Sequence, residues 1–324
     1  MKRTRAQKLL NELRGRRVLV LGDIMLDEFT WGRARRIAPE APVPVVEVER
    51  ETRHLGGAAN VGANILNLGG IPLVVGVTGT DTSREILKTE FEKLGLEACG
   101  LVADASRPTT VKTRVIAHSQ QVVRVDRENR SPVNAQIEQD LIETALEFLD
   151  EVDAVVISDY DKGVLTPGLL QAVLPQARRQ DLPVCLDPKL RNFPFYKPVT
   201  VITPNHHEAE AITRRTIESE ETLIEIGHEV RRMLDFPNVL ITRGEEGMSL
   251  FAASGDLTHI PTVAREVYDV TGAGDTVVAT LALALAAGAS MLEAAVLSNH
   301  AAGVVVGKVG TATAKPQEVL ASFS

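Results

Sequence analysis

The residues with the clearest chemical potential lie near the carboxyl end, in the segment DVTGAGDT at 269–276. Gly272, Ala273 and Gly274 form a small, permissive turn that leads into an Ala- and Leu-rich helical stretch. The amides of such a turn can converge on an anion at a helix N-terminus, where the helix dipole favours negative charge. Asp275 follows in the first helical turn. An ionised carboxylate beside an anion-binding turn suits in-line phosphoryl transfer, because it can accept the proton of the attacking hydroxyl.

The same segment has a simpler interpretation, since glycine-rich turns and first-turn aspartates are also common helix caps. Other phosphate and nucleophile motifs are absent from the sequence: there is no GxxxxGK[ST], no GxSxG, no HExxH and no GxGxxG after a strand. The missing dinucleotide fingerprint argues against an α/β dehydrogenase. A phosphate site in this chain must therefore be of another kind.

The elements that would position these residues alternate between short apolar runs and helical patterns. Strands are predicted at 17–22, 71–77, 154–158, 184–187, 199–203 and 239–242. Helices are predicted at 57–68, 84–94, 136–149, 167–180, 220–234, 272–287 and 291–306. This alternation predicts an α/β fold, in which helices cover both faces of a mostly parallel sheet.

Two segments depart from this alternation. Residues 42–50 and 109–127 alternate apolar and charged side chains, which predicts strands with one buried and one solvated face. The prolines of the first segment suit an edge strand. We therefore expect a single domain, 1–324, with a small antiparallel β lid formed by segments at about 33–53 and 108–127.

Charge and cysteine usage limit the classes of partner. The chain has 35 Lys and Arg residues against 43 Asp and Glu residues, a formal net charge of −8. This balance argues against nucleic acid as the main partner, since phosphate neutralisation needs clustered basic residues. Cys99 and Cys185 are far apart in the sequence and lack a CxxC pattern, so a reducing compartment fits best. The apolar stretch 277–289 is too short to span a bilayer, and we expect a cytoplasmic protein without a membrane partner.

Three motifs carry a family resemblance. GGAAN at 56–60, TPNHHE at 203–208 and DVTGAGD at 269–275 resemble the ribokinase-type, or PfkB, carbohydrate kinases. The likeness covers essentially the whole chain and narrows to the kinase part of bacterial ADP-heptose synthesis enzymes. The segments that carry this narrower likeness are GDIMLDEFTWG, RRIAPEAPVPVVEV, HLGGAANVGANILNLGG, SDYDKG, LDPK, TPNHHEAEA, EEGMSLF and YDVTGAGDTV. Two positions depart from the pattern, Ala38 in place of serine and TRGEEG in place of TRSEQG.

The resemblance implies a ribokinase-like three-layer α/β/α sandwich and an ATP-dependent sugar kinase. The implied reaction phosphorylates C1 of D-glycero-D-manno-heptose 7-phosphate to the 1,7-bisphosphate, on the way to ADP-heptose and lipopolysaccharide. Asp275 would be the catalytic base, and Gly272–Gly274 would form the anion hole. The resemblance also implies a homodimer through the β lid, and the chain leaves no room for the nucleotidylyltransferase domain of bifunctional members.

Nucleotide and metal residues follow from the same resemblance. Asn205 and Glu208 match an NxxE motif, in which Glu208 would hold Mg²⁺ through water, although capping of a helix explains the pair as well. Residues matched to the ATP site are Thr242, Arg243, Gly244, Gly247, Asn299 and Gly303. A strand-to-strand turn is the alternative for the four that lie at 242–247. Asp269 and Thr271 match a monovalent-cation (K⁺) loop, with a helix N-cap as the alternative for Thr271.

Sugar ligands are expected where the predicted strands end. Asp23 and Asp27 follow the first strand and could accept hydroxyl hydrogens, and Asp187 and Lys189 end another strand at the same expected edge. Gly56, Gly57 and Asn60 would let the backbone approach the sugar. Cations that could hold the 7-phosphate are Arg35, Arg36, Lys112, Arg114, Lys162 and Lys189, although Lys112 and Arg114 equally suit a solvated strand face.

Two rival functions remain open from the sequence. One is another sugar kinase of the same fold, acting on ribose or fructose 6-phosphate, against which RRIAPEAPVPVV argues. The other is a non-catalytic sugar-sensing relative. The presence of Asp275, Gly272, Gly274, Asn205 and Glu208 argues against that second rival, because a degenerate site usually loses such residues first.

Overall fold

The fold is built on one large twisted sheet. The computed structural model describes residues 1–118, 120–264, 267–308 and 310–323. Within them the sheet has nine strands, in the order β13 (Leu257–Ile260), β12 (Met248–Phe251), β11 (Asn238–Thr242), β10 (Val201–Ile202), β9 (Val184–Asp187), β8 (Ala154–Ser158), β1 (Arg17–Gly22), β4 (Ile71–Thr78) and β5 (Leu101–Ala103). Only β12, near one edge, runs antiparallel to its neighbours β11 and β13. The predicted mostly parallel sheet is confirmed.

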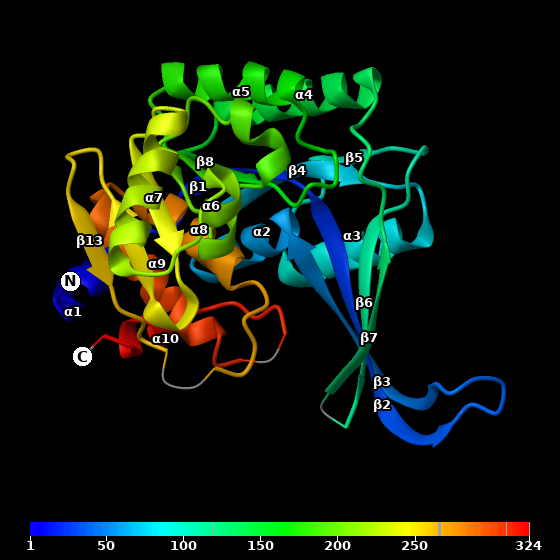
Figure 1. Ribbon diagram of the computed structural model, residues 1–324. Coiled ribbons are helices and arrows are strands. Elements are labelled where there is room, and N and C mark those ends of the chain that lie inside the picture. The colour runs from blue at the N-terminus through cyan, green and yellow to red at the C-terminus, as the bar shows by residue number, and fades with distance from the viewer. Residues whose placement is uncertain (119, 265–266, 309, 324) are drawn as a thin grey trace.

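Helices cover both faces of this sheet, and each face has its own hydrophobic core (Figure 1). One face carries α1 (Arg3–Glu12), α2 (Ala58–Asn67), α3 (Thr82–Leu94), α8 (Ala273–Ala286), α9 (Met291–Val305) and α10 (Pro316–Ala321). The other carries α4 (Ala135–Leu149), α5 (Pro167–Arg179), α6 (His206–Thr213) and α7 (Glu220–Met233). The central strand β1 serves both cores, because Val18 and Val20 face one side while Leu19 and Leu21 face the other. The three-layer sandwich is therefore confirmed.

Several helices begin where a side chain caps their free amide groups. Asp81, Asn134 and Thr166 accept first-turn amide bonds at the starts of α3, α4 and α5. Ser219 and Ser290 do the same for α7 and α9. Each cap satisfies a donor that the helix itself leaves unpaired. These caps explain why the predicted helix boundaries agree with the observed ones to within about two residues.

The small sheet stands beside the body as predicted. Its strand order is β3 (Pro44–Gly57), β2 (Ile24–Ile37), β6 (Thr110–Ala117) and β7 (Gln120–Arg127). The β2–β3 and β6–β7 pairs are antiparallel, while β2 and β6 run parallel. Figure 1 shows the far end of the β2–β3 hairpin projecting well away from the helices of the body. We call this four-stranded sheet the lid; its residue 119 lies outside the described residues.

The lid contains one long strand that the sequence pattern does not reveal. β2 begins only one residue after β1 ends, so the chain passes directly from the large sheet into the lid. Register shifts between Trp31 and Gly32 and between Ala34 and Arg36 interrupt its pairing with β3. Such bulges break the period-two alternation that identifies a strand. The lid hairpin thus spans Ile24–Gly57 instead of 33–53, and the strand predicted at 199–203 shortens to Val201–Ile202.

Among the described residues, no helix combines the length and the apolar sequence that a membrane crossing requires.

The close approach of β1 and β8 at Gly22 gives a test of how the sheet positions the site. A Cβ atom at Gly22 would collide with the carbonyl oxygen of Ser158, so we expect Gly22→Ala to push the two strand ends apart. The expected loss is about 1–3 kcal/mol in the free energy of unfolding, measured by urea denaturation. Ser158→Ala is the matched control at the same contact. It removes a buried hydroxyl without a hydrogen-bond partner, so its stability should hardly change. Equal losses in both variants would contradict this account.

Candidate active site

The site is centred on Asp275, in the first turn of α8. Its side chain is only 2% exposed, and both carboxylate oxygens accept a hydrogen bond. Asn60 Nδ2, from α2, donates to Oδ2 at 2.8 Å, and the Tyr160 hydroxyl donates to Oδ1 at 2.7 Å. Residues from three distant parts of the chain therefore converge on one carboxylate.

Burial and neighbouring charges set the protonation of this group. Burial raises the pKa of Asp275 to about 6, because desolvation disfavours the charged form. The bonds from Asn60 and Tyr160 lower the pKa, and nearby Asp27 raises it. A base with this pKa is ionised at neutral pH and can still take up a proton, which is what general-base chemistry needs.

The turn before Asp275 has the backbone geometry of an anion site. Gly272 is the N-cap of α8 and has φ 79°, in the left-handed region. A Cβ atom there would lie 2.7 Å from Asn60 Nδ2. Glycine is therefore required both by the left-handed backbone conformation and by the lack of room for a side chain. The amides of Gly274 and Asp275 belong to the first helical turn, where donors have no intrahelical acceptor. The predicted anion-binding turn therefore has the expected position beside Asp275.

Asp23 has a different environment from the one its predicted role as a sugar ligand needs. Its carboxylate is 1% exposed and accepts the backbone amides of Tyr160 at 2.7 Å, Lys162 at 3.2 Å and Val164 at 3.3 Å. Burial and the neighbouring Asp159 raise its pKa. The carboxylate is thus used to hold the loop after β8, which carries Tyr160.

Asp27 and Arg114, both predicted to bind substrate, bind each other. Arg114 Nη1 lies 2.5 Å from Asp27 Oδ1, and the guanidinium stacks 5.1 Å from the Phe29 ring centre. Asp27 is inside β2 instead of in a loop, and its carboxylate occupies the space that a Cβ at Gly56 would need. At Gly57 the positive φ of 57° allows the turn from β3 into α2. The pair lies at the junction of lid and body.

The other cations predicted for a phosphate are less available. Lys112 Nζ lies 3.2 Å from Asp126 and 3.7 Å from Glu128, and Lys162 Nζ lies 2.7 Å from Glu128. These four residues form a largely buried charge cluster between the lid and the loop after β8.

Arg35 and Arg36 lie near the far end of β2 and are exposed. Arg36 pairs in register with Val45 on the projecting hairpin (Figure 1). The structure therefore does not bring these two arginines to Asp275 within one chain.

A small cavity of about 160 Å³ adjoins the base, and predicted metal and sugar residues line it. They include Asp187, Lys189, Asn205 and Glu208, together with Gly274. Asn205 and Glu208 form the capping box of α6, with amide–side-chain distances of 2.9 Å in both directions. Lys189 forms an ion pair with Glu208. The capping interpretation of the NxxE pair is confirmed, and the Glu208 side chain faces the cavity as well.

A second cavity, of about 460 Å³, brings together most of the predicted nucleotide residues. Thr242, Gly244, Gly247, Asn299 and Gly303 line it. The turn interpretation of 242–247 also holds, since a short 3₁₀ helix, Gly244–Glu246, joins β11 to β12.

Two of the predicted nucleotide residues are committed to protein contacts. Arg243 is not among the lining residues and binds Glu246 and Ser249 instead. The Asn299 amide nitrogen donates to the Pro261 carbonyl at 2.8 Å, and a Cβ at Gly303 would press on Val263. The glycine on α9 is therefore needed for close packing of the segment that bounds the cavity.

Sequence reasoning missed two sets of residues here. Tyr160 lies in SDYDKG directly after a strand predicted to end at the ligand-binding edge, so its position carried a usable signal. The apolar wall of the larger cavity gave none, because such residues look like ordinary core; it comprises Met248, Val267, Val270, Val277, Ala302 and Val306.

The loop at Asp269 is closed by its own side chain. Asp269 accepts the amide of Thr271 at 2.9 Å and that of Gly310 at 3.0 Å, which ties the segment before α8 to the loop after α9. The N-cap of α8 is Gly272, so the N-cap alternative for Thr271 is wrong. Among the described residues, no group of three or more His, Cys, Asp or Glu side chains is placed to hold a metal ion.

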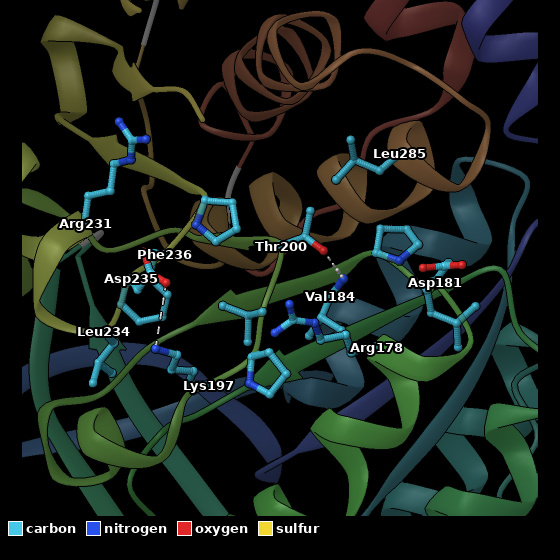
Figure 2. Close-up of a pocket in the computed structure, with 15 residues that line it drawn as sticks. Arg178, Asp181, Val184, Lys197, Thr200, Arg231, Leu234, Asp235, Phe236 and Leu285 are labelled. Carbon is cyan, nitrogen blue, oxygen red and sulfur yellow. Dashed lines mark hydrogen bonds and ion pairs between the residues drawn. The ribbon is translucent and has the colours of Figure 1, made fainter. Parts of the chain in front are cut away.

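A further cavity, of about 630 Å³, lies away from this site. It opens near the amino-terminal ends of β9 to β11, the opposite edge of the sheet from Asp275. Figure 2 shows charged side chains of both signs around it, with Lys197 and Asp235 4.0 Å apart and the Thr200 hydroxyl accepting the Val184 amide. Parallel α/β sheets bind ligands at the carboxyl ends of their strands, so size alone does not identify the active site.

The model of the pfkB family carbohydrate kinases matches residues 16–318. Bifunctional protein HldE of Geobacter metallireducens is 47% identical over 323 residues, covering 100% of this chain and 66% of the relative. Bifunctional protein HldE of Geobacter sulfurreducens is 46% identical, with the same coverage of both chains. The chain thus spans a little less than two thirds of the length of these relatives.

The solved structures support the fold. The Arabidopsis thaliana ribokinase complexed with ribose and ATP matches with a TM-score of 0.75 and 18% identity, over 96% of this chain and 99% of that one. The Escherichia coli phosphofructokinase-2 in complex with potassium matches with a TM-score of 0.77 and 18% identity, over 96% and 98%. The ribokinase-like fold is shown by these structures, and the match over residues 16–318 shows that the chain is a member of the pfkB family of carbohydrate kinases, which transfer a phosphoryl group to a sugar hydroxyl.

Proposed function

We propose that this chain transfers the γ-phosphoryl group of ATP to O1 of D-glycero-D-manno-heptose 7-phosphate, as a step of ADP-heptose and lipopolysaccharide precursor synthesis. The observation that carries the transfer is the buried Asp275 carboxylate beside the glycine turn of α8. The choice of sugar rests on the heptose-type segments of the sequence and on the 44–47% identity to HldE proteins along the chain. ATP chemistry would place the enzyme in the cytoplasm.

The chain's own residues divide the work of this reaction. Asp275 accepts the O1 proton as O1 attacks the γ-phosphorus and the bond to the β-phosphate oxygen breaks, releasing ADP. The first-turn amides of α8 donate to the oxygens of the moving group, whose charge the helix dipole also favours. Asn60 keeps the carboxylate turned toward the acceptor. The lid excludes water, which would otherwise compete as acceptor.

The small cavity fits a magnesium ion. Asp187 and Glu208 both face it, and Asp187 has a pKa well above its ordinary value because its carboxylate is buried. A divalent cation would relieve that cost, and few carboxylates suffice because Mg²⁺ keeps several waters. When bound, Mg²⁺ neutralises charge on the phosphates. We infer that Glu208 and Asp187 hold it, with Lys189 moving from Glu208 to a phosphate oxygen.

The larger cavity fits the nucleotide. Its apolar wall can enclose an adenine ring, and the amide of Gly244, which has a positive φ, can approach a phosphate oxygen, whereas the Gly247 amide donates to the Gly244 carbonyl at 3.1 Å. We further infer a K⁺ site at the Asp269–Thr271 loop. The first support is the Asp269 carboxylate, whose pKa is lowered, against the effect of burial, by hydrogen bonds from the Thr271 side chain and from the Thr271 and Gly310 amides. The second is a structural neighbour crystallised with potassium.

The lid supports a homodimer. Its two hairpins expose apolar side chains that a single chain leaves uncovered, namely Ile37, Val43, Val48, Val122, Val123 and Val125. A second copy of the chain would bury this surface and would bring Arg35 and Arg36 toward the partner's site. We expect light scattering to give twice the 35.0 kDa mass of the chain, and Val48→Asp with Val125→Asp to give the monomer. A monomeric wild-type protein would contradict the dimer.

Arg114 provides the test of substrate choice. We expect heptose 7-phosphate to give a higher kcat/KM than ribose, fructose 6-phosphate or unphosphorylated heptose in an ATP-consumption assay. Because a charged hydrogen bond to phosphate contributes about 1.5–3 kcal/mol, Arg114→Ala should reduce the preference for heptose 7-phosphate over heptose by about 10- to 100-fold. Arg36→Ala should reduce it only in the dimer.

Lys88→Ala is the control, because this lysine lies on the exposed face of α3 and pairs only with Glu85 among the contacts described. Higher turnover on another sugar than heptose 7-phosphate would favour a different sugar kinase. An unchanged preference in Arg114→Ala would instead remove that residue from the phosphate site.

Asp275 provides the test of the chemistry. Since the ionised carboxylate is the active form and its pKa is about 6, kcat/KM should fall about tenfold per unit as pH drops below that value. Asp275→Asn should lower kcat by about 10²–10⁴-fold at pH 7 and above, where the wild-type carboxylate is ionised, and should remain folded.

The sugar phosphate itself titrates near this pH, so the profile is repeated with unphosphorylated heptose, which has no phosphate group. If the fall in kcat/KM at low pH, the acidic limb of the profile, disappears with this acceptor, the titrating group is the phosphate of the substrate and not Asp275. Near wild-type turnover in a folded Asp275→Asn protein would refute the base.

A further inference from the structure

Tyr160 is the one phenol that contacts the candidate base in the described part of the chain. It follows β8 in the segment SDYDKG, and its hydroxyl donates to Asp275 Oδ1 at 2.7 Å. Its ring lines the small cavity together with Asp187 and Lys189. The residue therefore lies between the base and the side of the site proposed for magnesium and phosphate.

The main chain of Tyr160 is held by the buried carboxylate of Asp23. Its amide donates to Asp23 at 2.7 Å, and Asp23 also accepts the amides of Lys162 and Val164. The neighbouring Asp159 accepts the Asp161 amide at 2.7 Å. These two buried carboxylates hold the loop from which the phenol reaches Asp275.

The groups around Asp275 come from four elements. Asn60 of α2 donates to one carboxylate oxygen, and Tyr160 donates to the other. Asp27 of β2 and Asp187 of β9 are like charges that disfavour ionisation, whereas Lys189 favours it. Lys189 Nζ also lies 5.6 Å from the Tyr160 ring centre. With two acidic neighbours and burial against it, the charged carboxylate is stabilised by its two donors together with Lys189 and the N-terminus of α8.

The two donors differ in what they can do. The Asn60 amide fixes orientation, and a phenol is the more acidic donor, so its bond strengthens more when the acceptor is charged. Burial and Asp275 itself raise the pKa of Tyr160 well above its ordinary value, so the hydroxyl keeps its proton over the working range of pH. It therefore remains a donor before and after Asp275 takes up the acceptor's proton.

We propose that Tyr160 is a positioning residue of the reaction, which aims the Asp275 carboxylate at the acceptor hydroxyl and stabilises its charge through the phenol. The proposal rests on the proposed role of Asp275 as base. It assigns Asp23 to the same unit, as the anchor of the loop that carries the phenol.

The test compares Tyr160→Phe with a matched control, Tyr196→Phe. Tyr196 is also buried; its hydroxyl donates to Asp159 at 2.5 Å and accepts the Lys189 amide at 3.0 Å, so the control loses a buried phenol that is bonded to residues other than Asp275. Both variants and Asp275→Asn are assayed from pH 5 to 9 with heptose 7-phosphate, and their thermal unfolding and KM for ATP are measured in parallel.

Loss of a hydrogen bond to a charged group should raise the apparent pKa of the base, so the acidic limb of Tyr160→Phe should move up by about one unit or more. At pH 7 kcat/KM should fall about tenfold or more, and part of that loss should be recovered at pH 9. KM for ATP should stay unchanged. Tyr196→Phe should keep the wild-type limb even if its unfolding temperature drops.

The outcomes separate this proposal from the proposed function. An unshifted limb in Tyr160→Phe, with the same fractional loss at every pH, would overturn the role of Tyr160 while Asp275→Asn remains inactive. Activity in Asp275→Asn would overturn the base and this proposal together. An equal shift in Tyr196→Phe would show that general loosening of the buried carboxylates, and not the phenol, moves the limb, and would also overturn it.

Discussion

The cost of keeping a carboxylate charged inside a protein governs the architecture of this site. Asp275 is almost completely buried, and burial alone would favour its neutral form. The chain offsets this with the N-terminus of α8, the amide of Asn60 and the phenol of Tyr160. Each of these must be held in place by a separate part of the fold, so the positions of α2, α8 and the loop after β8 are linked through a single functional group.

The parallel sheet is what makes that convergence possible. The segments that meet at Asp275 follow the carboxyl ends of β1, β8 and β9 or begin the helices that pack against them. Gly22 lets β1 and β8 approach closely enough for Asp23 to reach three amides of the next loop. The buried Asp23 carboxylate thus has a structural role. It accepts hydrogen bonds from loop amides that lie beyond the end of the strand and have no partner in the sheet.

Much of this could be predicted from sequence, because the signals were local. The strands 17–22, 154–158 and 184–187 agree with the observed bounds, and the glycine turn before Asp275 is where its residue types require it. Roles that depend on the partner of a side chain could not be predicted. Asp23 and Arg243 look like ligands in sequence, yet one holds backbone amides and the other pairs with Glu246. The bulges of β2 obscured its strand pattern, whereas Tyr160, which lies in SDYDKG directly after a predicted strand, carried a usable signal that was missed.

The pairing of cations around the cleft has a consequence for what kind of anion can enter. Arg114 is held by Asp27, Lys189 by Glu208, and Lys112 and Lys162 share Glu128. Each of these four basic side chains is already paired with a carboxylate. A phosphate that binds one of them must therefore replace that carboxylate as its partner. Binding is then an exchange of counterions, whose free energy is the small difference between two ion pairs. In the proposed reaction, such an exchange would favour a dianionic sugar phosphate over singly charged metabolites, although the protein is acidic overall.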